Sequence, residues 1–248
     1  MKLLGDVSIF EGSNSRFLGG VYMLIIGLGV IGLLFQLVFI NIEKKGDMKK
    51  ALLFKRMAAS LFLIAGFISL KDCPDKRFGL FIVLGLAFGW CGDFFMNYQF
   101  ISKKQKAVFL IGAMSFFVNH IFYIVALTPF VEGTFLKAFL VTGVALVTVT
   151  HWIVKQADAK LGLKIFGHVY LSTLTFITAE TLFMFLADTG NIGSLIMCIG
   201  AALFTVSDYI LILNAFSSKK KKWMRPANLI FYYLGQIIIV CSIMHYVG

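Results

Sequence analysis

The sequence predicts an all-α integral membrane protein with eight transmembrane helices, and three observations support this fold class. Hydrophobic residues make up 59% of the 248 residues and charged residues only 14%, against about 25% charged residues in soluble domains. The apolar residues fall in eight segments, each close to the roughly 20 residues that a helix needs to cross a bilayer. The three prolines all lie between these segments or at a helix start. Helices are expected because lipid offers no hydrogen-bond partner to an open backbone.

The eight segments form one predicted membrane domain over residues 1–248, without a linker or a soluble domain. The predicted spans are 17–40, 51–70, 79–97, 107–128, 135–154, 165–186, 192–216 and 227–247. Pro74, Pro129 and Pro226 support these boundaries, because a missing N–H is tolerated best outside a helix or in its first turn. We recognise no signal peptide before the first span, so that span is expected to serve as the insertion signal.

The net charge of +11 is explained by membrane topology rather than by nucleic-acid binding. Most of the 23 Lys and Arg residues lie in the connections after the first, third, fifth and seventh spans. The positive-inside rule places these connections in the cytoplasm and both termini on the opposite side. The run Lys219–Arg225 is expected to anchor to anionic headgroups. The membrane would be the inner membrane of a bacterium or the endoplasmic reticulum of a eukaryote.

Two aspartates interrupt otherwise apolar spans. Asp93 lies in "LGLAFGWCGDFFMN" and Asp208 in "GAALFTVSDYILILN". A charged group in the bilayer costs about 2.5 to 3.5 kcal/mol on insertion scales, so intramembrane carboxylates indicate function. When the two segments are aligned, the pairs are Gly85 with Gly200, Ala87 with Ala202, Gly92 with Ser207, Phe94 with Tyr209, and Met96 with Leu211. This pattern suggests two parallel four-helix halves.

Further polar residues are expected to share a polar interior with these aspartates. They are Lys55 in the second span, Asn97 one turn after Asp93, Asn119, His120 and Tyr123 in the fourth span, Ser207, and Tyr232 and Gln236 in the last span. Lys55 would alternatively reach the headgroups. Tyr170 in the sixth span either belongs to this polar interior or marks a membrane interface. Glu180 is expected outside this cluster. The histidines lack metal-ligand spacing, so no metal site is predicted, and Asp93, His120 and Asp208 would be the ligands of the weaker metal alternative.

At these residues the sequence resembles the YhhN-like membrane proteins, the lysoplasmalogenase family. The resemblance runs from the second span to the eighth and depends on the order of several characteristic residues. These residues are Lys55, Gly92 with Asp93, Phe109, Gly112, Phe116, His120, Tyr123, Ser207 with Asp208, and Tyr232 with Gln236. The sequence departs from the family at Lys55, which is followed by Arg56 where the family commonly has proline.

The resemblance implies hydrolysis of the vinyl ether bond of a lysoplasmalogen to a fatty aldehyde and glycerophospho-ethanolamine or -choline. Asp93 and Asp208 would be the acid–base pair, with Asp93 as base and Asp208 as acid. Lys55 would meet the lipid phosphate. Asn97, His120, Tyr123, Ser207, Tyr232 and Gln236 would shape the substrate site. The lysophospholipid would enter sideways between helices, and no cofactor is required.

A transporter or lipid-binding protein is the main alternative, in which the paired aspartates carry protons or a cation through the bundle. The parallel repeat would suit this class, but no helix is expected to be broken at the centre of the membrane. A third alternative is a structural or sensor protein, in which the aspartates serve stability alone.

Overall fold

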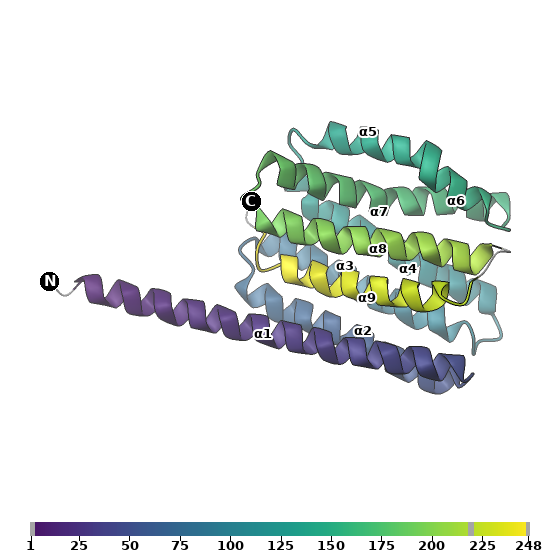
Figure 1. Ribbon diagram of the computed structural model, residues 1–248, viewed down its shortest axis with the longest axis horizontal. Coiled ribbons are helices and arrows are strands. Elements are labelled where there is room, and N and C mark those ends of the chain that lie inside the picture. The colour runs from purple at the N-terminus through teal and green to yellow at the C-terminus, as the bar shows by residue number, and fades with distance from the viewer. Residues whose placement is uncertain (1–2, 218–220, 247–248) are drawn as a thin grey trace.

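The computed structural model describes residues 3–217 and 221–246, which form one bundle of roughly aligned helices (Figure 1). Within these residues, eight helical segments are long and apolar enough to cross a membrane. This confirms the predicted fold class. The same residues contain no strand, apart from an isolated backbone bridge between Ala157 and Ser217.

The helices follow the predicted order of spans. They are α1 (Leu3–Lys44), α2 (Met48–Ser69), α3 (Lys76–Tyr98), α4 (Gln105–Leu127), α5 (Phe135–Ala145), α6 (His151–Lys155), α7 (Leu161–Ala187), α8 (Ile192–Phe216) and α9 (Met224–Ser242). Short 3₁₀ turns follow α2 (η1, Leu70–Asp72) and α4 (η2, Thr128–Phe130).

Three helix starts are fixed by polar side chains that satisfy free backbone N–H groups. Asp47, Asp75 and Asn191 each accept a hydrogen bond from the backbone N–H three residues later, at 3.1, 2.9 and 3.0 Å. These residues begin α2, α3 and α8. The cap at Asp47 also explains why α2 starts before the predicted residue 51, since Lys49 and Lys50 belong to its first turn.

The first helix and the last differ from the predicted spans. α1 begins at Leu3 rather than at residue 17, because no proline interrupts the residues before the apolar segment. α9 ends at Ser242, before the predicted residue 247. Of the basic run Lys219–Arg225, Lys219 and Lys220 lie outside the described residues.

The fifth predicted span is a composite of α5, a π-helical turn (η3, Leu146–Thr150) and α6. The hydroxyl groups of Thr142 and Thr148 donate to carbonyl groups four residues earlier, a pattern that often bends helices. The turn lies at the edge of the bundle, where α5 packs mainly on α7 (Figure 1). The chain stays helical there, and α3 and α8, which carry the two aspartates, are unbroken.

The order of helix packing is the same in the two halves of the chain. In the first half α1 packs on α2, α2 on α3 and α3 on α4; in the second, α5 packs on α7, α7 on α8 and α8 on α9. The last helix of each half also contacts the second helix of the other half, because α4 touches α7 and α9 touches α2. This arrangement supports the predicted parallel repeat.

Gly85 and Gly200, which occupy equivalent positions in the repeat, have the same role in helix packing. A Cβ atom on Gly85 would lie 2.4 Å from the Tyr123 ring of α4. A Cβ atom on Gly200 would lie 2.9 Å from the backbone nitrogen of Ile239 in α9. Both positions therefore allow the close approach of helices that small residues provide in membranes.

The two chain ends lie on the same side of the bundle. The start of α1 and the end of α9 are both on the left in Figure 1, as an even number of crossings requires. The connections expected in the cytoplasm lie at the opposite end. Which of these ends faces the cytoplasm remains a prediction from the Lys and Arg distribution.

Candidate active site

A cavity of about 1180 Å³ extends from one end of the bundle to both aspartates. Ligand pockets in proteins commonly measure about 300 to 1,000 Å³, so this cavity has room for a substrate. Its outer part is lined by residues at helix ends, including Gln99 after α3, Lys106 in the first turn of α4 and Lys160 before α7. Its inner part is lined by Asp93 and Asp208. The end at which it begins is the one predicted to face the cytoplasm.

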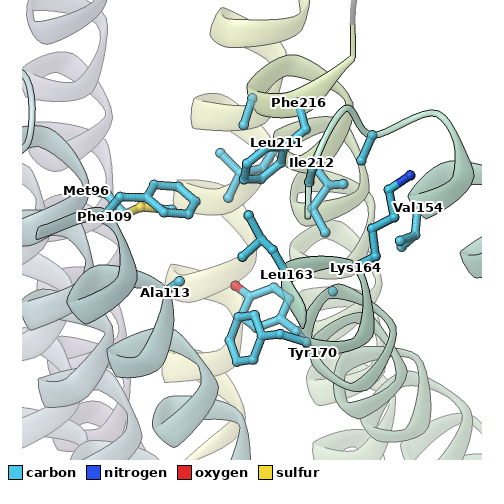
Figure 2. A pocket seen from close by; sticks show the side chains of 15 residues that line it. Met96, Phe109, Ala113, Val154, Leu163, Lys164, Tyr170, Leu211, Ile212 and Phe216 are labelled. Carbon is cyan, nitrogen blue, oxygen red and sulfur yellow. The ribbon is translucent and has the colours of Figure 1, made fainter. Parts of the chain in front are cut away.

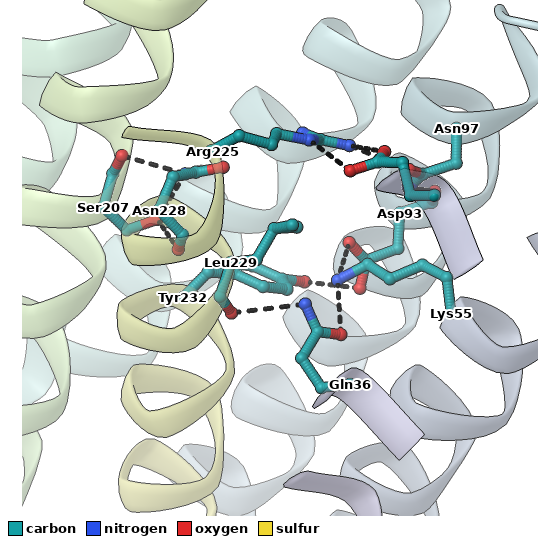
Figure 3. Close-up of polar contacts among 10 residues, drawn as sticks. Gln36, Lys55, Asp93, Asn97, Ser207, Arg225, Asn228, Leu229 and Tyr232 are labelled. Carbon is teal, nitrogen blue, oxygen red and sulfur yellow. Dashed lines mark hydrogen bonds and ion pairs between the residues drawn. The ribbon is translucent and has the colours of Figure 1, made fainter. Parts of the chain in front are cut away.

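Asp93 forms an ion pair inside the bundle (Figure 3). Its carboxylate lies 2.9 Å from the ammonium of Lys55, which is 1% exposed, while Asp93 is 4% exposed. The Tyr232 hydroxyl donates to the same carboxylate at 3.0 Å. Lys55 also donates to Gln36 at 3.3 Å and lies 4.6 Å from the centroid of the Tyr232 ring. Helices α1, α2, α3 and α9 therefore all contribute to holding the Asp93 carboxylate.

Asp208 is held differently. It is 2% exposed, and its carboxylate accepts a hydrogen bond from the hydroxyl of Tyr170 in α7. Among the described side chains, those of residues 19–217 and 221–246, no Lys, Arg or His forms an ion pair with it. Two aromatic rings lie beside its partner Tyr170, because the ring centroids of His120 and Phe166 are 4.8 and 5.8 Å from that of Tyr170. The Asp208 carboxyl thus has a neutral surrounding, while Asp93 has a cation.

The residues that contact the two aspartates lie at equivalent positions of the predicted repeat. Tyr170 precedes Asp208 by 38 residues, and Lys55 precedes Asp93 by the same interval. In each half the partner is therefore on the helix before the aspartate, at the equivalent position. The contact to the aspartate therefore comes from the same position in each half, but the contacting group is a cation in the first half and a phenol in the second.

Arg225 of α9 lies at the outer part of the cavity, above Asp93 and Lys55 in Figure 3. Its guanidinium donates to both carboxylate oxygens of Glu43 in α1, at 3.1 and 2.7 Å. It also donates to the Asn97 side chain at 3.1 Å. Asn97 in turn donates to the backbone carbonyl of Asp93 at 2.8 Å. Arg225 is thereby connected to the helical turn that carries Asp93.

The remaining predicted site residues lie close to the cavity without lining it. Ser207 donates to the backbone carbonyl of Asn228 at 2.9 Å and accepts from its side chain at 2.7 Å, so it joins α8 to α9. Tyr123 donates to Gln236 at 2.7 Å. His120 contacts the Thr173 hydroxyl at 3.0 Å. Asp93, Asp208, Lys55, Asn97 and Tyr232 are the predicted residues that the cavity brings together.

An apolar slot adjoins the cavity between α4, α7 and α8 (Figure 2). Met96, Phe109, Leu163, Phe166, Leu211, Ala215 and Phe216 line both the slot and the cavity. At its inner part the slot is bordered by Ala113 and by Tyr170, the partner of Asp208. The slot therefore reaches the side chain that donates to the carboxyl group of Asp208.

The described residues contain no group of three or more His, Cys, Asp or Glu side chains arranged to hold a metal ion. His120 does not join the aspartates as a ligand, because its ring nitrogen Nδ1 contacts Thr173 and its other nitrogen has no hydrogen-bond partner in this part of the chain. The residues present fit acid–base chemistry.

Gln36, Arg225 and Asn228 of this site were not predicted from the sequence, and Tyr170 was predicted to lie either in the polar interior or at a membrane interface. Tyr170 had a usable signal, because it is aligned with Lys55 by the same repeat that aligns the two aspartates. Arg225 was assigned to the basic run near the membrane surface. Nothing in the sequence shows that it turns toward Asn97, since that contact depends on how α9 packs against α3.

Comparison with known proteins identifies one family. Residues 50–243 match the YhhN family. Neither the comparison with curated proteins nor the comparison with solved structures gives a match. The matched range runs from α2 to the end of α9 and includes Lys55, Asp93, Asp208 and Tyr232. The chain therefore belongs to the YhhN family.

Proposed function

We propose that this protein hydrolyses the vinyl ether bond of a lysoplasmalogen, releasing a fatty aldehyde and a glycerophospho-alcohol. The observation that carries the proposal is the pair of buried aspartates, one from each half of the chain, that line a single cavity with different partners. Membership of the YhhN family, which includes lysoplasmalogenases, supports the same reaction.

The chemistry needs one proton donor and one carboxylate. Protonation of the alkenyl carbon farther from oxygen gives an oxocarbenium ion, and water then adds to the carbon beside oxygen. The resulting hemiacetal breaks its carbon–oxygen bond, which yields the aldehyde and a free glycerol hydroxyl. Glycosidases pass through a similar cation with two carboxyl groups in these two roles.

We assign the carboxylate role to Asp93 and the donor role to Asp208. The Lys55 ammonium 2.9 Å away balances the charge of Asp93. An opposite charge at this distance stabilises the ionised form of a carboxyl group. Asp93 would stabilise the oxocarbenium ion and accept the proton of the attacking water. Asp208 has the phenol of Tyr170 as its neighbour and would give its proton to carbon.

The cavity and the apolar slot suit a single-chain lipid. Charged and amide side chains line the outer part of the cavity, and Phe109, Phe166 and Phe216 line the slot. The headgroup would remain near the membrane surface, while the alkenyl chain lies along the apolar wall that the cavity shares with the slot. This pose brings the vinyl ether, at the junction of headgroup and chain, to the two carboxyl groups.

The test uses purified protein in detergent micelles and three lysophospholipids that share the ethanolamine headgroup. The first has a 1-alkenyl chain, the second a 1-alkyl chain and the third a 1-acyl chain. We expect fatty aldehyde from the alkenyl lipid, and no cleavage of the other two, because only a vinyl ether forms an oxocarbenium ion on carbon protonation. Folded protein that releases no aldehyde would contradict the proposal, and proton- or cation-coupled flux in liposomes would then favour the transporter.

A further inference from the structure

The ammonium of Lys55 is poorly placed to bind a lipid phosphate. It is buried, it is paired with Asp93 at 2.9 Å and it donates to Gln36 at 3.3 Å. Moving it to a phosphate would leave the buried Asp93 carboxylate without its partner, which is strongly destabilising. A different cation of the cavity is therefore needed for a phosphate group.

Arg225 has the position and the geometry for that role. It lines the cavity and its side chain is 26% exposed, so an anion can reach it from the outer part. Its hydrogen bonds to Glu43 and Asn97 use Nε and Nη2; among the described side chains (residues 19–217 and 221–246), Nη1 donates to no partner. Guanidinium groups bind phosphate and carboxylate oxygens in the same bidentate geometry.

The spacing along α3 between Asn97, the contact of Arg225, and Asp93 matches the glycerol backbone of a glycerophospholipid. Asn97, which accepts from Arg225 at 3.1 Å, follows Asp93 by four residues, and four helical residues rise about 6 Å. In the lipid, five bonds separate the ether oxygen from phosphorus, an extended span of about 6 Å. A phosphate on Arg225 would therefore leave the vinyl ether beside Asp93.

In this structure the Glu43 carboxylate is bound to the guanidinium of Arg225. Its two carboxylate oxygens accept from Nη2 and Nε at 2.7 and 3.1 Å, in the arrangement that a phosphate would adopt. Lys106 in the first turn of α4 and Lys160 at the start of α7 line the same cavity and add positive charge to its outer part. A phosphate that enters can then compete with the Glu43 carboxylate for Arg225.

Resting on the proposed function, we propose that Arg225 binds the phosphodiester of the lysolipid headgroup and that Glu43 is the internal anion which the phosphate displaces. The subsite selects phosphate-bearing vinyl ethers over neutral ones. Its position one helical turn from Asp93 sets the depth at which the ether oxygen stops.

The first test compares two vinyl ethers, a lysoplasmenyl-ethanolamine and the matching 1-alkenylglycerol, which lacks phosphate. In Arg225→Gln we expect KM for the phospholipid to rise about ten- to hundredfold, the effect of losing a hydrogen bond to a charged group. KM for the alkenylglycerol should change less than about twofold. Equal losses for both substrates would overturn the inference, because they would indicate a structural role for Arg225.

A binding experiment gives a readout that does not need turnover. The non-cleavable 1-alkyl lysophospholipid, the corresponding 1-alkylglycerol and inorganic phosphate are titrated calorimetrically into the detergent-solubilised protein. We expect tight binding of the phospholipid, weaker binding of the other two, and loss of the phospholipid's advantage in Arg225→Gln. Equal affinity of wild type for the two lipids would overturn the inference, and equal affinity for free phosphate and the phospholipid would overturn the lipid assignment. If wild type binds the phospholipid more tightly than the alkylglycerol but releases no aldehyde from the vinyl ether, the hydrolase proposal fails and the phosphate subsite stands.

Two further variants complete the design. Glu43→Gln removes the competing anion, so we expect severalfold tighter binding of the phospholipid, whereas a purely structural ion pair predicts unchanged or weaker binding. Arg77→Gln is the matched control, because Arg77 contacts Thr128 and Phe81 at the opposite end of α3. It should bind both lipids as wild type does, and a loss of discrimination there would contradict a local role for Arg225.

Discussion

At the scale of single residues, the difference between Asp93 and Asp208 is the main finding. Both carboxyl groups are buried, but only Asp93 has a cation within 4 Å among the described residues. The sequence predicted both aspartates as site residues, because charged groups inside spans are rare. It did not predict their partners, since the contacts of Lys55 and Tyr170 depend on the packing of α2 on α3 and of α7 on α8.

The first prediction concerns the buried ion pair. Lys55→Met leaves the Asp93 carboxylate unpaired in the bundle, and we expect a loss of stability of about 3 to 5 kcal/mol. The double variant Lys55→Met/Asp93→Asn should recover much of that loss, because neither charge then remains. Denaturation of the detergent-solubilised proteins measures this difference. If the double variant is no more stable than Lys55→Met, the two side chains are not coupled as described.

The second prediction concerns Tyr170. Tyr170→Phe removes the hydroxyl that donates to Asp208 and keeps the ring, so we expect kcat for aldehyde release to fall about 10- to 100-fold with little change in KM. Tyr123→Phe is the control, because Tyr123 donates to Gln236 and lines neither the cavity nor the slot. Similar losses in both variants would indicate a general effect of removing a buried hydroxyl.

At the scale of helices, hydropathy predicted the spans well and their ends less well. The caps at Asp47 and Asp75 define where α2 and α3 begin, and hydropathy alone does not indicate such caps. The π-helical turn in the fifth span could not be predicted, because the segment remains apolar through Leu146–Thr150. The apolar slot was likewise invisible in the sequence, since its walls come from α4, α7 and α8.

The third prediction tests the slot as part of the binding site of the alkenyl chain. In the proposed pose the vinyl ether end of the chain lies at the inner part of the slot, beside Tyr170. Ala113→Phe adds a ring there, so we expect kcat/KM to fall severalfold for long and short alkenyl chains alike. Ile111→Phe is the control, because Ile111 lies on the same helix, is 48% exposed and lines neither the cavity nor the slot. An unchanged kcat/KM in folded Ala113→Phe would argue against this path.

At the scale of the whole molecule, the parallel repeat organises the site. Equivalent helices pack in the same order in each half, and the partner of each aspartate precedes it by 38 residues. The sequence alignment suggested the repeat from glycine, alanine and aspartate positions alone. Pairing Lys55 with Tyr170 was missed because the two residues are chemically dissimilar, and only the structure shows that they have equivalent contacts.

The fourth prediction concerns orientation in the membrane. The Lys and Arg distribution places the connection between α3 and α4 in the cytoplasm and the connection between α7 and α8 outside. In a cysteine-free background, Gly190→Cys should react with a membrane-impermeant maleimide in intact cells, while Ser102→Cys should react only after permeabilisation. The reverse labelling pattern would show that the cavity begins on the outer side.

The central claim is that the two aspartates catalyse vinyl ether hydrolysis, and Asp208→Asn tests it most directly. This variant keeps the shape of the side chain and disrupts no ion pair among the described residues, so it should fold. Glu180→Gln is the matched control, because Glu180 is a buried carboxyl of α7 that contacts Thr134 and does not line the cavity. The measurement is aldehyde release from lysoplasmenyl-ethanolamine in micelles. We expect folded Asp208→Asn to lose about 10²- to 10⁴-fold in kcat, the usual contribution of a general acid, and Glu180→Gln to keep its activity. Wild-type rates in folded Asp208→Asn would contradict the account.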